Sequence, residues 1–308
     1  MPRLHPHPHA RDRHRRRRKL RDRLADWIGF GSVAVVLSFL LAVIVQLALT
    51  GAPRLNMDFL MNLPSSAPDR AGILPAWIGS LMLAAVCMLV AVPLGVGAGV
   101  YMEEYAPQGG LTRILDVTIA TLAGVPSVVF GLLGLALFVN GLDLGRSILS
   151  GGLTLALLVL PMVTLTTRES LRAVHQDLRE AALALGASPT HAVTSVILPA
   201  AAPGILTGVI LALARALGET APLILVGAVA FISFTPSPPI LNAAPYLSLA
   251  WLHEPFTVLP MQMFNWVSRP GEAFRANAAA AGLVLLAVTV LLNAGAIFLR
   301  AHLRRKRS

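Results

Sequence analysis

The sequence predicts an all-α membrane protein with six transmembrane helices, for three reasons. Of its 308 residues, 56% are hydrophobic and only 13% are charged, whereas soluble domains carry about a quarter charged residues. Six apolar runs are long enough to cross a hydrocarbon core, which takes about 20 residues. These runs do not alternate with period two, which excludes the strands of a membrane β-barrel.

The six predicted spans are separated by more polar segments. They cover residues 28–50, 76–100, 117–139, 147–166, 202–231 and 278–299. Glycine and proline recur inside them, and bilayer helices tolerate both because neighbouring groups satisfy the freed backbone atoms. The fifth predicted span is the longest, and it is the only one with charged residues near its middle.

Positive charge predicts the orientation in the membrane. Residues 1–27 form a basic tail that we expect to be disordered, and residues 300–308 form a second basic tail. If both termini are cytoplasmic, inner segments hold 19 of the 25 Lys and Arg residues and outer segments hold five, as the positive-inside rule requires. A nucleic-acid binder also carries basic tails, but these flank apolar spans, so we expect contact with membrane lipid instead.

Residues 28–50 are predicted to be an uncleaved first span. A signal peptide has a shorter apolar run of about 7–15 residues. The polar residues 51–75 then read as a periplasmic loop. A second outer segment, residues 232–277, contains Trp251, Phe256, Phe264 and Trp266, which predicts a stretch lying at the membrane interface.

The longest predicted inner segment reads REAALALGASPTHAVTSVILPAAAPG. Residues 177–186 are good helix formers, and Gly186 marks the end of that helix or a tight turn. Thr190 to Ile197 predict a second short helix, after which Pro199 begins the next span. A short helix pair exposed between two membrane helices is suited to binding by a cytoplasmic partner.

This inner segment resembles the EAA signature of type I ABC importer permeases, E-A-A-x(3)-G-x(9)-I-x-L-P. Val196 stands where isoleucine is usual, and every other fixed position matches. In that family the segment docks into a cleft of the ATPase subunit. The resemblance therefore implies that residues 177–199 are a coupling loop. Its motif residues would be Glu180, Ala181, Ala182, Gly186, Leu198 and Pro199.

Four further segments resemble the PstA family of phosphate importer permeases. They are YMEEYAP (101–107), LAGVPSVVFGLLGLALFV (122–139), ARALGETAPLILVG (214–227) and LPMQMFNWVSRPGEAFRANAAAA (259–281). The resemblance implies a MetI-like permease domain over residues 76–299 in the bacterial inner membrane. It implies a partner permease PstC, two copies of the ATPase PstB and a periplasmic phosphate-binding protein PstS. It also leaves room for a phosphate-signalling regulator.

No ATP site is expected in this chain. A P-loop requires a Gly-Lys-Ser/Thr turn, and the only lysines, Lys19 and Lys306, lie in the basic tails. The sequence has no Ser/His/Asp or Cys/His catalytic grouping, and its single Cys87 lies in an apolar run. We therefore expect a transporter subunit rather than an enzyme, binding no cofactor itself, with ATP and magnesium used by the partner ATPase.

The stretch LALARALGETAPLILVG (211–227) contains the most unusual charges. An ionised arginine near mid-span costs about 2.5–3.5 kcal/mol, so such groups usually face protein or water. Arg215 and Glu219 are four residues apart and share one face of a helix. A guanidinium matches a phosphate oxyanion. We therefore predict that Arg215 contacts the substrate and that Glu219 holds the Arg215 side chain in place. The alternative is a salt bridge that only joins two helices.

The remaining charged residues on the predicted inner side are expected to make structural contacts. Glu103 and Glu104 read as a solvated helix end or a subunit contact, and Arg168, Arg172 and Arg179 as anchors to anionic lipid or the ATPase.

Two other functions also remain open. One is import of another oxyanion, such as phosphonate, sulfate or molybdate, and the other is a membrane scaffold in phosphate sensing.

Overall fold

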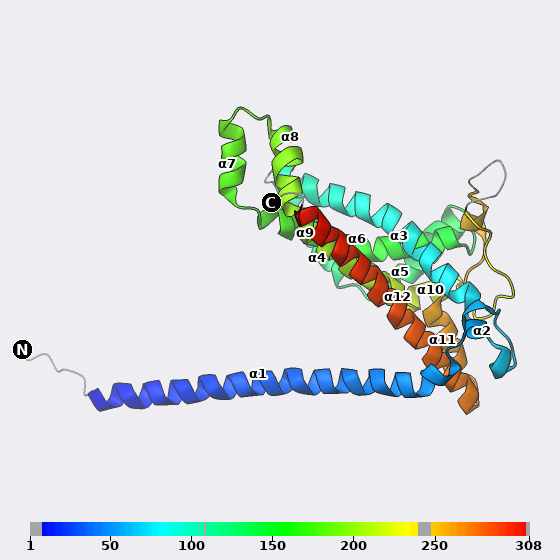
Figure 1. The fold of residues 1–308 in the computed structure, drawn as a ribbon. Coiled ribbons are helices and arrows are strands. Elements are labelled where there is room, and N and C mark those ends of the chain that lie inside the picture. The colour runs from blue at the N-terminus through cyan, green and yellow to red at the C-terminus, as the bar shows by residue number, and fades with distance from the viewer. Residues whose placement is uncertain (1–7, 108, 240–247, 306–308) are drawn as a thin grey trace, which may run out of the picture. The chain divides into compact units, whose positions relative to one another are not determined.

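The computed structural model describes residues 8–107, 109–239 and 248–305 (Figure 1). In these ranges helices are the only regular secondary structure and no strand forms, which confirms the all-α prediction. It divides into two compact units, Met1–Thr50 and Gly51–Ser308. The first consists of helix α1 (Pro8–Gly51), which continues beyond the unit boundary by one residue.

Both basic tails continue the helices of the adjoining spans. Helix α1 begins at Pro8, inside the tail expected to be disordered, and the last helix continues to Arg305. Arginine, lysine and leucine are all good helix formers, so each apolar span extends as a helix into its basic flank. The predicted loop 51–75 also contains short helical segments.

The second unit holds eleven α-helices within its described residues. They are α2 (Met57–Met61), α3 (Leu74–Val100), α4 (Gly110–Ala123), α5 (Ser127–Gly134), α6 (Ile148–Arg172), α7 (Gln176–Ala184), α8 (Pro189–Ala192), α9 (Leu198–Gly218), α10 (Ala221–Val226), α11 (Leu259–Val267) and α12 (Glu272–Arg305). Three wide π-helical turns adjoin them, at Tyr101–Tyr105, Leu135–Gly141 and Val193–Ile197. Short 3-10 turns lie at Ala52–Arg54, Pro68–Arg70 and Ala250–His253.

Five helical segments are long and apolar enough to cross a membrane, and a bent helix pair supplies a sixth span if it is counted as one. The five are Asp26–Arg54, Leu74–Tyr105, Ile148–Arg172, Pro189–Gly218 and Glu272–Phe298. The bent pair, Gly110–Ala123 and Ser127–Gly141, makes an angle of 104°. The span predicted over 117–139 is therefore a bent pair of helices and not one continuous helix. Gly124 and Pro126 lie at the bend, and proline disfavours helical geometry in the residue before it.

The fifth span also differs from its prediction. One helical segment runs from Pro189 to Gly218, so the second short helix expected at 190–197 is the beginning of this span. The segment ends at Gly218 rather than continuing to residue 231, and α10 follows as a separate short helix with proline in its first turn. Proline is suited to the first turn because the backbone donor it lacks is unpaired there anyway.

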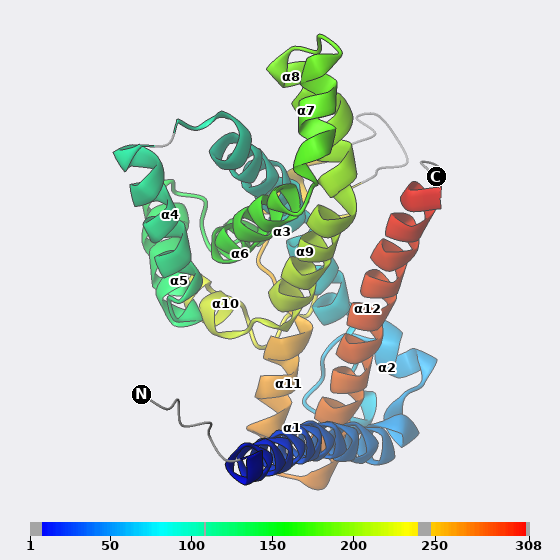
Figure 2. The same cartoon turned by 90° about the vertical axis from the view of Figure 1, so that its left-hand side faces the viewer.

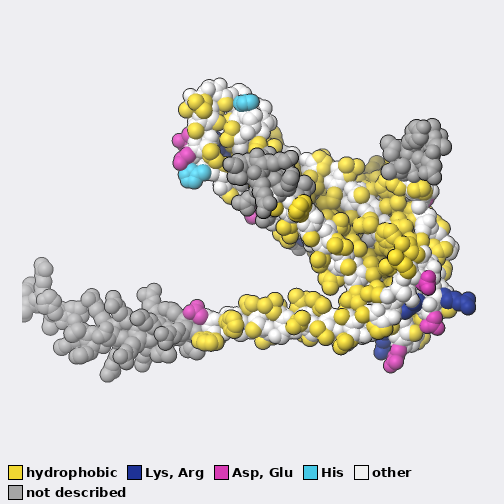
Figure 3. All heavy atoms as spheres, viewed as in Figure 1, with side chains coloured by type: hydrophobic (Ala, Val, Ile, Leu, Met, Phe, Trp, Pro, Cys, Tyr) yellow, Lys and Arg dark blue, Asp and Glu magenta, His cyan; other side chains and the backbone are white. Residues whose placement is uncertain are grey.

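Helix α6 lies at the centre of the second unit and packs against α3 and α9 (Figure 2). Glycines allow the close approach to α3: a Cβ on Gly99 would stand 2.7 Å from Thr167, and a Cβ on Gly95 would stand 2.8 Å from Val163. Small residues at helix contacts are the usual means of packing membrane helices. Apolar side chains cover the outer face of this unit in Figure 3, as expected for a protein surrounded by lipid.

Two aromatic residues predicted at the membrane interface lie in the core instead. Phe256 and Trp266 are both fully buried, whereas Phe264 is exposed. Trp266 stacks on Phe59 with ring centroids 5.9 Å apart. The segment after residue 248 thus folds back on the helices, and its large aromatic rings fill that core.

Candidate functional site

Arg215 and Glu219 meet at the end of α9. The Arg215 Nε atom lies 3.4 Å from the Glu219 Oε1 atom. Arg215 is in the last turn of α9, and Glu219 caps that helix with extended backbone angles of −78° and 128°. The contact predicted from their spacing is therefore present, but the two residues do not lie on one continuous helix, and the charges are at a helix end rather than in mid-span.

The helix that follows this break packs against the second half of the bent third span. Helix α10 begins two residues after Glu219 and packs against α5 (Figure 2). The contact is close, since a Cβ on Gly131 would lie 2.7 Å from the Pro222 Cα atom. Two interrupted helices thus lie side by side, and interrupted helices in transporters typically surround the substrate path.

The pair is accessible in this chain. The Arg215 side chain is 38% exposed and that of Glu219 is 20% exposed. A partly exposed ion pair of this kind contributes about 0–1 kcal/mol to stability, and a cation in the last turn of a helix adds about 0.3–1 kcal/mol. The geometry therefore leaves the guanidinium available to an anion, and neither term requires an arginine here for folding.

The predicted coupling loop begins with α7 and a sharp turn. Gly186 adopts φ of +85°, and its N–H donates to the Leu183 carbonyl at 2.9 Å. The Ala187 N–H donates to the Ala182 carbonyl at 3.2 Å. These two hydrogen bonds form a Schellman motif, which ends a helix most easily with glycine in the left-handed position. The prediction that Gly186 ends this helix is confirmed.

The loop exposes an apolar surface. Glu180 and Ala181 are exposed while Ala182 is buried, and Leu185 is 89% exposed. Leu178 and Leu183 are exposed on the same helix. Exposed leucines at a chain turn are typical of a surface that a partner covers.

Leu198 and Pro199 do not lie in a loop. They begin α9, directly after the π-helical turn Val193–Ile197. Proline crowds the preceding helical turn, and a wide turn there relieves that crowding. The C-terminal part of the EAA signature therefore belongs to the fifth span, which continues into the coupling loop without a break.

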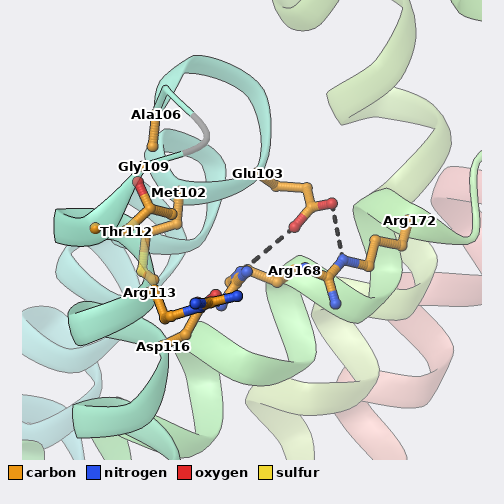
Figure 4. Close-up of a pocket in the computed structure, with 10 residues that line it drawn as sticks. Met102, Glu103, Ala106, Gly109, Thr112, Arg113, Asp116, Arg168 and Arg172 are labelled. Carbon is orange, nitrogen blue, oxygen red and sulfur yellow. Dashed lines mark hydrogen bonds and ion pairs between the residues drawn. The ribbon is translucent and has the colours of Figure 1, made fainter.

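A charged network at this end of the bundle was not predicted. Figure 4 shows Glu103 between Arg168 and Arg172, with Nε to carboxylate distances of 3.4 Å and 2.8 Å. Arg168 also pairs with Asp116. These groups line a cavity of about 570 Å³ beside the start of α4.

Glu104 is likewise not solvated. It is 3% exposed and accepts two hydrogen bonds from Arg179, at 2.6 Å and 2.8 Å. The interpretation of the acidic pair as a solvated helix end is wrong, and the three arginines meet carboxylates of their own chain. The order of the spans could have predicted these pairs. The acids follow the second span and the arginines follow the fourth, so both groups are expected on the same side of the membrane.

The fold and the exposed loop define a class, that of polytopic membrane subunits that bind a partner through a short helical loop. Residues 91–308 match the family model described as binding-protein-dependent transport system inner membrane component. The chain belongs to this family, and it is a multi-pass protein of the inner membrane.

Individual relatives cover most of the chain. It is 33% identical over 276 residues to the probable ABC transporter permease protein YqgI of Bacillus subtilis, covering 89% of this chain and 92% of that one. It is 32% identical over 291 residues to the phosphate transport system permease protein PstA of Haemophilus influenzae, covering 94% and 96%. A PstA 1 protein of Mycobacterium tuberculosis is 34% identical over 237 residues, covering 77% and 73%.

Solved structures agree on the fold. A bacterial alginate ABC transporter chain aligns with a TM-score of 0.62 at 14% identity, covering 90% of this chain and 93% of that one. The MetNI methionine ABC transporter in an inward-facing conformation aligns with a TM-score of 0.55 at 14% identity, covering 75% and 95%. The chain therefore has the MetI-like permease fold.

Proposed function

We propose that this chain is the permease subunit of an ATP-driven importer of inorganic phosphate. The observation that carries the proposal is the 32% identity with a phosphate transport system permease over 94% of the chain. The exposed leucines of α7 and the arginine at the end of α9 support the proposal. Other oxyanions have no comparable support.

The partners follow from the same relationship. A second permease, PstC, would complete the path, two PstB subunits would hydrolyse ATP, and the binding protein PstS would deliver phosphate. The chain itself would bind no nucleotide, since its only lysines are Lys19 and Lys306. Both termini would lie in the cytoplasm, because that places most basic residues inside.

Arg215 would form a transient anion site, with Glu219 as its tether. A guanidinium remains ionised and offers two parallel donors to a phosphate oxyanion. The carboxylate 3.4 Å away partly neutralises this charge, so that phosphate binds weakly enough to leave again, as conduction requires. The ATPase pair would bind Glu180, Ala181 and the leucines of α7, and closing of that pair would displace α7.

Reconstitution tests the proposal directly. The chain is incorporated into liposomes with PstC, PstB and PstS, and ATP-dependent uptake of phosphate, sulfate and phosphonate is measured. We expect uptake of phosphate alone. Uptake of sulfate or phosphonate without phosphate would contradict the substrate assignment, and ATP-stimulated signalling without any uptake would favour the scaffold.

A further inference from the structure

The acidic pair at the end of α3 connects the coupling loop to the helical bundle. Glu103 and Glu104 lie in the π-helical turn Tyr101–Tyr105. Wide turns of this kind are rare and occur frequently at functional sites. Glu104 faces α7, where Arg179 donates to both of its carboxylate oxygens at 2.6 Å and 2.8 Å. This is the two-point geometry that fixes orientation as well as distance.

Helix α7 has few other contacts that would hold it. Within α7, all of which the structure describes, Ala182 is the single buried residue. The other ion pair of this region, His175 with Asp177, is highly exposed and contributes little by comparison. The buried Glu104 carboxylate is therefore the main polar contact between α7 and the end of α3.

The same turn extends the connection to two more helices. Glu103 accepts from Arg172 at 2.8 Å and from Arg168 at 3.4 Å, both on α6. Arg168 is buried and also pairs with Asp116 on α4 (Figure 4). Four helical segments, the turn after α3 and the helices α4, α6 and α7, are thus joined by one group of six charged side chains.

We propose that these six residues form a coupling unit in which Arg179 and Glu104 transmit the displacement of α7 to α3, and Arg168 transmits it to α4 and α6. The unit comprises Glu103, Glu104, Asp116, Arg168, Arg172 and Arg179. The inference rests on the proposed function, because it requires an ATPase that acts on α7. These are positioning residues, which do not touch the substrate.

The test uses the reconstituted complex and measures phosphate imported per ATP hydrolysed. Arg179→Gln leaves the buried Glu104 carboxylate without its counter-charge, which is costly while α7 stays in place. Glu104→Gln removes the same contact but leaves only the 32% exposed Arg179 unpaired. We expect that ratio to fall at least about tenfold while ATP hydrolysis continues. Arg113→Gln is the matched control, since Arg113 lines the cavity next to Glu103 and Arg168 but makes no ion pair with the described residues. It should leave the ratio unchanged.

A covalent replacement separates positioning from charge. In the double variant Glu104→Cys with Arg179→Cys, a short bismaleimide joins the two sites before the partner subunits are added. Within this chain only the introduced thiols react, because the single native cysteine, Cys87, is fully buried. The unjoined variant should import poorly, and joining should restore most of the lost ratio.

Each remaining outcome has a defined meaning. Normal import by the unjoined double variant would overturn the coupling unit, and so would joining that restores nothing. Failure of the variants to assemble with PstC and PstB would assign the pair to folding and overturn it as well. A wild-type complex that hydrolyses ATP in response to PstS but imports no phosphate would instead contradict the proposed function.

Discussion

Replacing Arg215 by glutamine should abolish transport while the protein remains folded. The guanidinium makes one long ion pair, 3.4 Å to Glu219, and is 38% exposed. An ion pair of this kind contributes about 0–1 kcal/mol, and the favourable position at the end of α9 adds about 0.3–1 kcal/mol. The stability loss is therefore at most about 2 kcal/mol, or a few degrees in the unfolding temperature.

The effect on transport should be larger. A hydrogen bond to a charged group is worth about 1.5–3 kcal/mol, which corresponds to about ten- to hundredfold in affinity. If Arg215 binds the anion in the path, uptake in liposomes should fall by at least this factor. Glu219→Gln keeps the shape and a neutral acceptor, so its uptake should fall less.

The control and the refutation are both direct. Arg275→Gln removes an arginine that is exposed on α12, and it should change neither uptake nor stability. If Arg215→Gln imports phosphate at the wild-type rate, Arg215 is not in the substrate path. If the variant instead loses assembly with PstC, the pair serves to join helices, which is the structural alternative.

Three other substitutions test the fold around these sites. Gly186→Ala places a side chain at φ of +85° with nothing within 4 Å of its Cβ, so its cost is backbone strain of about 1–2 kcal/mol. Hydrogen exchange of the α7 amides should become faster. The control is Gly97→Ala, in open space on α3, which should stabilise the protein slightly. Gly131→Ala forces a Cβ to 2.7 Å from the Pro222 Cα atom, and overpacking of about 1–3 kcal/mol should lower both the unfolding temperature and uptake. Arg54→Met removes the donor to three backbone carbonyls at 2.7–3.1 Å, so the unfolding temperature should fall by an amount equivalent to about 1–3 kcal/mol, with proteolysis in the 51–75 segment.

The number and order of the spans could be predicted because apolar length alone determines them. The breaks could not, although each carries proline. Pro93 and Pro161 lie inside continuous helices, whereas Pro126 and Pro222 follow breaks. The difference lies in the four residues before each proline. Gly124 is among those before Pro126, and Gly218, Glu219 and Thr220 are among those before Pro222. The four residues before Pro93 and the four before Pro161 include neither glycine nor a polar residue.

The candidate sites show the same limit. Gly186 was predictable because a helix end has a local signature. The contact of Arg215 with Glu219 was predictable from spacing, but the helix end between them was not. Glu103 and Arg168 are 65 residues apart, so no local pattern joins them. Their pairing depends on which spans end together, and on α3 packing closely against α6 through glycines.

Helix α6 gives these separate observations a common physical basis. Its C-terminal end carries Arg168, which belongs to the coupling unit, while its N-terminal half packs against α5 so closely that a Cβ on Gly134 would overlap the Thr154 hydroxyl. On the other side of α5, a Cβ on Gly131 would lie only 2.7 Å from the Pro222 Cα atom of α10. Close-packed contacts of this kind transmit displacement instead of absorbing it. A shift of α7 would thus reach the break that holds Glu219 through rigid contacts, and Gly131→Ala should reduce uptake even where ATP hydrolysis is unaffected.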